Sequence, residues 1–315
     1  MAKKILILGA SGFIGTNLVN YFSQQEEYDV HAHFRESSVK FNYPLKINYG
    51  DLRNPDTVES LLRDMDVVIH AAAVTSGSKD IVQRPYIHVT DNAIMNSLVL
   101  QKAHEVNVKH VIFLSCTVMY EPKDIPQTEN DHDENQPIYP TYFGVGNMKV
   151  YSEKLCEFYS RLGNTKYTAL RHSNVYGPHD KFDLQKGHVL AASIVKVLNS
   201  SDTINVWGTG QAKRDLIYID DLLDAIHKCI DKQKDPYKLF NIGSGVAYSI
   251  AEIINLIKVK AGKPKLELKF DTTKPDIPTT VIIDCAKANK ELGWKCQTSL
   301  PKGVEKTLRW YKENA

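Results

Sequence analysis

Short apolar runs alternate with longer segments of helical periodicity through the first half of the chain. The strand-like runs cover 4–8, 28–34, 45–49, 66–70, 109–114 and 166–171. The helical patterns lie between them, near 13–25, 55–63, 89–106 and 143–162. Strands that are apolar on both faces are typical of parallel sheets covered by helices on both sides. The alternation therefore predicts right-handed βαβ units and an α/β fold of the Rossmann type, with a doubly wound parallel sheet.

Two regions depart from this alternation. Residues 120–141 are rich in Pro, Asp, Glu and Asn, and we expect a long loop that borders a functional site. After residue 172 the pattern becomes irregular, and short helices are expected near 219–231 and 249–261. This part should form a smaller mixed α/β C-terminal domain over the carboxyl edge of the sheet, where such sheets bind ligands. The expected division is a dinucleotide-binding domain over 1–172 with about 206–232, and a substrate-binding domain over 173–205 and 233–315.

The first apolar run breaks into a glycine-rich turn that leads directly into a helix. Its sequence is Gly9-Ala10-Ser11-Gly12-Phe13-Ile14-Gly15. Glycines at this spacing let a diphosphate approach the backbone, and the free N–H groups and positive dipole of the helix favour an anion there. Because the motif follows a strand and precedes a helix, it predicts a dinucleotide site at Gly9, Gly12, Phe13, Ile14 and Gly15.

Composition excludes several other classes of protein. The 315 residues carry a net charge of +2 without a long basic run, so a nucleic-acid partner is not indicated. The five cysteines include no close-spaced pair, which argues against a metal site or a disulfide framework. No apolar run approaches the roughly 20 residues of a membrane span, and the N-terminus enters a strand at once. We expect a cytoplasmic protein without metal, membrane or nucleic-acid partners.

Motifs along most of the chain carry a family resemblance. In order they are Gly9–Gly15, Gly50-Asp51-Leu52, His70-Ala71-Ala72, Asn92, Phe113-Leu114-Ser115, Asn174-Val175-Tyr176-Gly177-Pro178, Arg214-Asp215, Tyr218-Ile219-Asp220-Asp221, Asn241-Ile242-Gly243-Ser244-Gly245 and Leu292-Gly293-Trp294. The chain resembles the extended short-chain dehydrogenase/reductases that act on nucleotide sugars. Two stretches are most similar to the GDP-sugar branch typified by GDP-L-fucose synthase: Tyr176–Phe182 followed by Gly187-His188-Val189, and Thr273-Lys274-Pro275-Asp276.

The resemblance implies a nicotinamide dinucleotide cofactor that is bound tightly. It places Asp51 and Leu52 beside the adenine, and adds Ala71, Ala72, Ala73, Asn92, Lys149 and His172 to the cofactor site. The second strand ends without the acidic residue that would hold a ribose 2′-hydroxyl and favour NAD. Arg35 stands there instead, and it could pair with the 2′-phosphate of NADP or stack on the adenine of either cofactor. NAD and NADP both remain open.

The catalytic pattern of the family is incomplete. A tyrosine phenol acts as acid/base there, four residues before a lysine on the same helix face. The lysine matches Lys149, but Val145 stands at the tyrosine position. Cys116, followed by Thr117, takes the strand-end position where Ser or Thr is usual. Val118 replaces the cysteine that serves the fucose synthases as epimerisation base, although His179 matches its partner histidine.

Three interpretations of the missing tyrosine stay open. Another group can replace the phenol, with Tyr142 the leading candidate and Cys116, Thr117 or a water held by Lys149 as further ones. The enzyme can instead keep its cofactor through a redox cycle. Alternatively, the protein is a non-catalytic sensor of dinucleotide and nucleotide sugar. A 4,6-dehydratase is disfavoured because Thr117-Val118-Met119 lacks the acidic residue of that branch.

The resemblance also implies a substrate and an assembly. It assigns Asn174, His188, Val189, Trp207, Arg214 and Lys274 to the nucleotide sugar. The expected activity is a dehydrogenase or 4-keto reductase at C4 of a GDP-linked, manno-configured hexose or heptose used for surface polysaccharides. A nucleotide-sugar epimerase is the alternative activity. The expected assembly is a homodimer or homotetramer built on the helices near 89–106 and 143–162.

Overall fold

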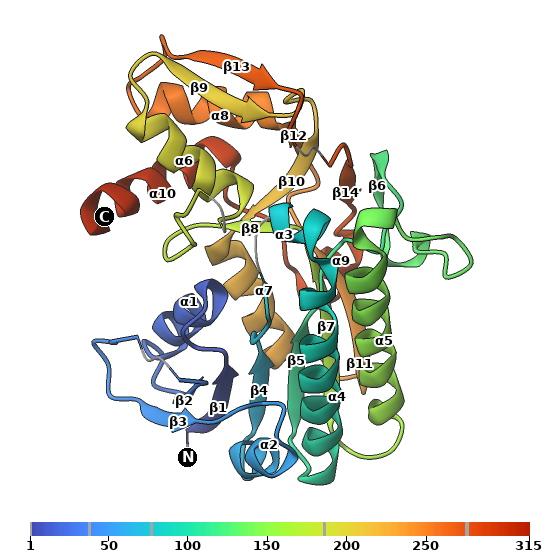
Figure 1. The fold of residues 1–315 in the computed structure, drawn as a ribbon. Coiled ribbons are helices and arrows are strands. Elements are labelled where there is room, and N and C mark those ends of the chain that lie inside the picture. The colour runs from blue at the N-terminus through green and yellow to red at the C-terminus, as the bar shows by residue number, and fades with distance from the viewer. Residues whose placement is uncertain (1, 37–38, 76–77, 185–186, 275–276) are drawn as a thin grey trace.

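The computed structural model describes residues 2–36, 39–75, 78–184, 187–274 and 277–315 (Figure 1). Within these ranges the largest sheet has seven strands, all paired in parallel, in the order β11-β7-β5-β4-β1-β2-β3. They are β1 (Lys3–Leu8), β2 (Tyr28–Phe34), β3 (Lys46–Tyr49), β4 (Val67–His70), β5 (His110–Leu114), β7 (Lys166–His172) and β11 (Tyr237–Ile242). Six of them match the strands expected from sequence, which confirms the Rossmann-type parallel sheet.

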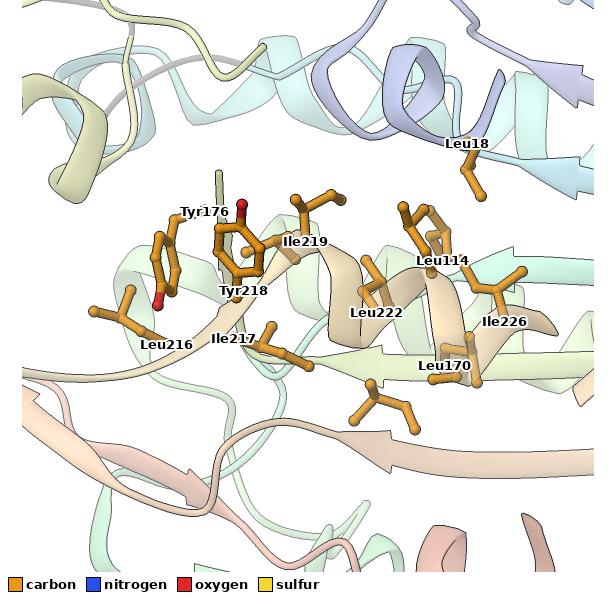
Figure 2. Packing of buried hydrophobic residues seen from close by; sticks show 14 of the residues in the cluster. Leu18, Leu114, Leu170, Tyr176, Leu216, Ile217, Tyr218, Ile219, Leu222 and Ile226 are labelled. Atoms are coloured by element: carbon orange, nitrogen blue, oxygen red, sulfur yellow. The ribbon is translucent and has the colours of Figure 1, made fainter. Parts of the chain in front are cut away.

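Helices cover both faces of this sheet because the strands are apolar on both sides. One face carries α1 (Phe13–Phe22) and α7 (Ile219–Lys232), and the other carries α2 (Pro55–Leu62), α4 (Thr90–Glu105) and α5 (Phe143–Ser160). Figure 2 shows Leu222 and Ile226 of α7 beside Leu114 and Leu170 of the sheet. These side chains are almost completely buried, so α7 is part of the core of the large domain.

A smaller lobe lies above the carboxyl edge of the large sheet (Figure 1). It holds a three-stranded sheet of β8 (Asn174–Tyr176), β10 (Lys213–Tyr218) and β12 (Ala247–Ser249), and a parallel pair of β9 (Thr203–Trp207) with β13 (Glu267–Asp271). Its helices are α6 (Val189–Asn199), α8 (Ile250–Lys260) and α10 (Leu300–Asn314), and α9 (Ala286–Leu292) lies between β11 and α7. The carboxyl edge, where Leu8, His33 and His70 are in register, therefore faces this lobe.

Two segments differ from the sequence-based expectation. Residues 237–242, expected in the smaller domain, form the edge strand β11 and pair with β7. Lys238 and Asn241 interrupt the apolar residues of this strand, and this weakened the signal. In contrast, about 206–232 was expected in the dinucleotide-binding domain, but its strand β10 pairs with β8 and β12 of the smaller lobe.

The expected loop 120–141 is also more structured than its composition suggests. It contains β6 (Lys123–Gln127), which pairs in parallel with β14 (Val281–Ile283), and the short helical turns η2 (Glu129–Asp131) and η3 (Pro140–Tyr142). Two further short elements, α3 (Ser78–Gln83) and η1 (Pro85–His88), precede α4. The pairing of β6 with β14 ties the loop to the C-terminal part of the chain.

None of the helices in the described ranges combines the length and apolar character that crossing a bilayer requires.

A buried histidine at the start of β5 should make folding stability depend on pH. His110 is 2% exposed and donates from Nε2 to Thr168 Oγ1 at 2.8 Å, and burial lowers its pKa to about 3. In the unfolded chain its pKa returns to about 6.5, so the unfolded state takes up a proton that the folded state refuses as pH falls. This histidine should therefore remove about 2 kcal/mol of stability between pH 7 and pH 5.

Urea unfolding at the two pH values measures that loss. His110→Gln keeps a donor at the same place but does not titrate. Its loss of unfolding free energy between pH 7 and pH 5 should be smaller than that of the wild type by about 2 kcal/mol. An equal loss in both proteins would show that His110 is protonated in the folded state.

Candidate active site

The glycine-rich turn between β1 and α1 is a cradle that side chains would fill. A Cβ at Gly9, whose φ is +82°, would lie 2.6 Å from Cα of Ala72. A Cβ at Gly15 would lie 2.1 Å from the carbonyl oxygen of Gly9. No acidic residue stands in the first turn of α1, so the positive end of its dipole is not neutralised there. The turn thus fits the diphosphate of a dinucleotide, as its sequence predicts.

A cleft of about 400 Å³ opens beside this turn at the carboxyl edge of the sheet. Its lining includes eight of the residues expected to bind cofactor, namely Gly9, Gly12, Arg35, Asp51, Leu52, Ala71, Ala72 and Ala73. Ser11, His33, Arg53, Asp91 and Lys181 also line it and were not expected. Phe13, Ile14 and Gly15 form the first turn of α1 behind the cradle. The size and position of the cleft suit an adenosine diphosphate group.

A charged cluster borders the cleft where β3 ends. Arg53 forms ion pairs with Asp51 at 2.6 Å and with Asp91 at 3.2 Å. The hydrogen bonds from Arg53 lower the pKa of Asp51 to about 2, so this carboxylate stays ionised at neutral pH. Arg35 lies 3.3 Å from Glu36 and is largely exposed. The cluster offers both a carboxylate acceptor and a guanidinium donor to an adenosine.

His33 joins the two turns that shape this cleft. The N–H of Gly9 points at His33 Nδ1 at 3.4 Å, and the other ring nitrogen, Nε2, lies 3.0 Å from the carbonyl oxygen of Gly50. This pattern assigns the proton to Nε2, and burial lowers the pKa of His33, which keeps the ring neutral. The sequence could have indicated this role, because His33 lies in a buried strand, where a polar side chain needs hydrogen-bond partners.

Asn92 on α4 holds the loop that follows β4. Its side-chain oxygen accepts from the N–H of Val74 at 2.8 Å, and its amide donates to the carbonyl oxygens of Val74 and His88 at 3.0 and 2.9 Å. The residue expected to bind cofactor thus fixes the wall of the cleft at Ala71–Val74 instead of lining it.

Lys149 is a residue of α5, on the face of this helix that meets the sheet, and its side chain reaches the end of β5. Its Nζ donates to the carbonyl oxygen of Leu114 at 2.7 Å and lies 4.8 Å from the centre of the Phe113 ring. Burial lowers the pKa of Lys149, and raises that of the neighbouring Cys116 thiol, which the lysine charge opposes. His172, at the end of β7, is also close to Lys149, and burial lowers its pKa to about 4. His172 is therefore a neutral ring at pH 7.

A second, narrow pocket of about 60 Å³ gathers residues expected to serve catalysis and substrate binding. Thr117, Tyr142, Asn174 and Arg214 line it, together with Val118, Tyr120, Pro122, Tyr139, Lys213, Thr279 and Val281. Tyr142 stands immediately before α5, on η3. Burial raises the pKa of its phenol, and the Arg214 charge acts against this rise. Among the described residues that line this pocket, the aromatic hydroxyl closest in sequence to Lys149 is that of Tyr142.

Arg214 is held in place by backbone carbonyls in the same pocket. Its guanidinium donates to the carbonyl oxygens of Lys213 and Thr279 at 2.7 Å and of Ile277 at 3.0 Å. Asn174 donates to the carbonyl oxygen of Asp215 at 3.0 Å, which fixes its amide at the pocket wall. The pocket thus presents a fixed cation and an amide beside a phenol.

Other residues expected at the site lie outside both linings. His179 has a φ of +64° and packs its ring on Trp310 at 4.7 Å between centroids. Trp207 has Lys196 Nζ 5.6 Å above its ring, and Lys274 is exposed. His188 contacts Asp180 at 3.2 Å and precedes Val189, the first residue of α6. Pro275 and Asp276 lie outside the described residues.

A buried polar network behind the pocket was not expected. Glu153 and Arg171 form an ion pair at 2.7 Å, and each side chain is 4% exposed. Ser115 donates to Glu153 at 2.5 Å, Arg171 donates to Tyr120 at 3.0 Å, and Tyr120 donates to Asn241 at 2.7 Å. Since these residues come from β5, α5, β7, β11 and the loop before β6, the network fixes α5, and with it Lys149, relative to the sheet.

The seven-stranded parallel sheet and the glycine turn after its first strand in sequence define a Rossmann-type α/β protein. The chain belongs to the NAD dependent epimerase/dehydratase family, whose model matches residues 5–243. It is 29% identical to the GDP-L-fucose synthase of Azorhizobium caulinodans over 98% of this chain and 96% of that protein. It is 28% identical to the GDP-L-colitose synthase of Yersinia pseudotuberculosis over 98% and 97%.

Solved structures are similar along the whole chain. The UDP-glucose 4-epimerase of Thermotoga maritima, determined with UDP-glucose, superposes with a TM-score of 0.86 at 26% identity and covers 98% of this chain and 99% of its own. The sequence-based assignment to the extended nucleotide-sugar family is thereby confirmed. Within the described residues, no group of three or more His, Cys, Asp or Glu side chains is placed to hold a metal ion.

Proposed function

We propose that this protein is a nicotinamide-dependent oxidoreductase that interconverts an alcohol and a ketone at C4 of a nucleotide-linked sugar. The observation that carries the proposal is the narrow pocket in which Tyr142, Thr117, Asn174 and Arg214 meet. A phenol supplies the acid/base group, and a guanidinium suits the diphosphate of a nucleotide sugar. Cys116, a further candidate for handling the proton, precedes Thr117 of this pocket and lies near Lys149, the lysine expected at the cofactor.

The chemistry divides between cofactor and protein. The hydride chemistry at C4 would be supplied by a bound nicotinamide. Tyr142 gives a proton to the C4 oxygen during reduction and takes one during oxidation. It thus takes the role of the family's tyrosine, whose position Val145 occupies here. Lys149 is a buried cation near Cys116, and its charge favours the ionised form of a nearby acidic group. Arg214 and Asn174 orient the sugar nucleotide, and Thr117 donates to the sugar.

A GDP-linked, manno-configured hexose or heptose is the proposed substrate, used in making surface polysaccharides. Similarity to a GDP-L-fucose synthase and a GDP-L-colitose synthase over nearly their whole lengths supports this choice. The cofactor is NAD or NADP, and the exposed Arg35 at the end of β2 supports NADP.

A binding protein without catalysis is the second candidate. It is favoured by Val145 at the position of the family's tyrosine and by the bond from Lys149 to the carbonyl oxygen of Leu114, which uses one of the three N–H donors of the ammonium. Such a protein would bind dinucleotide and sugar nucleotide without turnover. An epimerase is less favoured because Val118, rather than a base, lines the pocket.

The purified protein distinguishes these functions. Its absorbance near 340 nm and the mass of any dinucleotide released on denaturation report which cofactor it carries. Reduced or oxidised cofactor is then followed at 340 nm with GDP-, UDP- and dTDP-linked 4-keto and 4-hydroxy sugars. Turnover with a GDP-sugar supports the proposal. Binding of all ligands without any redox change would instead support the non-catalytic binding protein.

A homo-oligomer built on α4 and α5 is also proposed. Tyr151 and Phe158 are both 51% exposed, and they share one face of α5 because they are seven residues apart. Ile94 on α4 is 41% exposed. Large apolar side chains gathered on adjacent helices are typical of a protein interface.

Phe158→Glu should convert this oligomer into monomers, because a carboxylate would be buried without a partner. Sedimentation velocity should give at least twice the chain mass for the wild type and the single-chain mass for the variant. Val259→Glu is the matched control, since Val259 is 63% exposed on α8. A wild type that sediments as a monomer would rule out the interface.

A further inference from the structure

One segment of the smaller lobe reaches the cofactor cleft. Residues 177–183, the strap, follow directly after β8 (Figure 1). Asn17 of α1 anchors one side of the strap by donating to the carbonyl oxygen of Pro178 at 2.9 Å. Phe182 anchors the other side, with its ring 5.7 Å from Trp310 and 4.6 Å from Tyr311 on α10. The strap is therefore fixed to both lobes.

The conformation of the strap selects which side chain faces outward. His179 adopts a left-handed φ of +64° and packs against Trp310. The next residue, Asp180, is 6% exposed, and its carboxylate accepts from the N–H of Lys181 at 2.7 Å. With His179, Asp180 and Phe182 packed against protein, Lys181 is left exposed and lines the cofactor cleft. Of the described lining residues, it alone comes from beyond Met95.

Lys181 differs from the other cations in the cleft in having no ion-pair partner among the described residues. Arg35 is paired with Glu36, and Arg53 is paired with Asp51 and Asp91. Lys181 has no acidic partner in the part of the chain that the structure describes. Asn17, which holds the strap, also donates to the carbonyl oxygen of Phe13 in the first turn of α1 at 2.9 Å. The strap thus lies beside the first turn of α1, which follows the glycine turn.

We propose that Lys181 is a phosphate clamp whose ammonium binds the diphosphate of the dinucleotide together with the N-terminus of α1. The inference rests on the proposed function, because it takes the cleft as the cofactor site. A diphosphate placed between the ammonium of Lys181 and the positive end of α1 would accept charge-assisted hydrogen bonds from both. Since the strap belongs to the smaller lobe, the clamp links retention of the cofactor to the lobe that holds the sugar nucleotide.

Binding measurements without any sugar test the clamp. The wild type, Lys181→Ala, Lys181→Arg and the exposed control Lys302→Ala are titrated calorimetrically with NADPH, NADH, ADP-ribose and adenosine 2′-monophosphate. Lys181→Ala should lower the affinity for the three diphosphate ligands by one common factor of about 10 to 100. It should leave adenosine 2′-monophosphate unchanged, and Lys181→Arg should restore most of the affinity. Thermal unfolding of each apo variant shows whether it is folded.

Two results would overturn the clamp. If folded Lys181→Ala binds NADPH, NADH and ADP-ribose as the wild type does, Lys181 does not contact the diphosphate. If Lys181→Ala loses affinity for adenosine 2′-monophosphate by the same factor, Lys181 contacts the adenosine end of the cleft. A wild type that binds none of the dinucleotides contradicts the proposed function itself, and this result is visible before any variant is compared.

Discussion

Tyr142→Phe should lower kcat by about 100- to 10,000-fold, the usual contribution of general acid–base catalysis. The substitution removes one hydroxyl from the narrow pocket and leaves the aromatic ring in place. Because Tyr142 lines the pocket of Arg214 and Asn174 rather than the cofactor cleft, the affinity for dinucleotide should not change. Steady-state kinetics at 340 nm and calorimetric titration of the cofactor measure the two effects separately.

A matched pair of variants isolates the role of this phenol. Tyr139 lines the same pocket, with its ring 6.2 Å from that of Tyr142, and Tyr139→Phe should cost less than about tenfold in kcat. Adding Val145→Tyr to Tyr142→Phe places a phenol four residues before Lys149, on the same helix face. This double variant should recover part of the lost kcat. A Tyr142→Phe enzyme with full activity would remove the phenol from the mechanism.

Glu153→Gln should lower the free energy of unfolding by about 3–5 kcal/mol. The carboxylate is buried, and its loss leaves the guanidinium of Arg171 without a counter-charge, in a place where each side chain is 4% exposed. Ser115 also loses its charged acceptor. Denaturant unfolding followed by tryptophan fluorescence and circular dichroism measures the change.

The control lies one turn further along the same helix. Glu157 pairs with Arg161, whose side chain is 70% exposed, and Glu157→Gln should cost less than about 1 kcal/mol. Combining Glu153→Gln with Arg171→Met should regain part of the lost stability, because no unpaired charge remains buried. Equal effects of the two glutamine substitutions would mean that water reaches Arg171.

Much of the large domain could be predicted from sequence because its signals are local. The strands β1, β4 and β5 are short apolar runs, and the spacing of the glycines between β1 and α1 predicts the turn there. The strand β11 was missed, since its residues Lys238 and Asn241 interrupt the apolar pattern. Asn241 is nevertheless completely buried, because it bonds with Tyr120 and the backbone of Gln127. Such a partner, more than 100 residues away, leaves no local pattern.

The candidate site was predictable to different degrees at its two ends. The glycine turn and Asp51 follow motifs of fixed spacing, and the structure places them around one cleft. Tyr142 could only be nominated, because whether η3 turns its ring toward Arg214 depends on packing between distant segments. His179 illustrates the opposite case, since its motif suggested chemistry but its ring rests on Trp310 of the last helix. Lys181 lies within the stretch Tyr176–Phe182 that carried the resemblance, but nothing in that stretch pointed to the cofactor cleft.

The late position of β11 has a consequence for how this chain is made. As the chain leaves the ribosome, six strands of the large sheet are available once His172 has emerged, but the seventh follows only 65 to 70 residues later. Until then β7 has an open edge, and open edges invite pairing with other chains. Most of the segment that emerges in the interval forms β8, α6, β9, β10 and α7. The large domain is thus completed only after part of the smaller lobe has been synthesised, so the two cannot fold strictly one after the other.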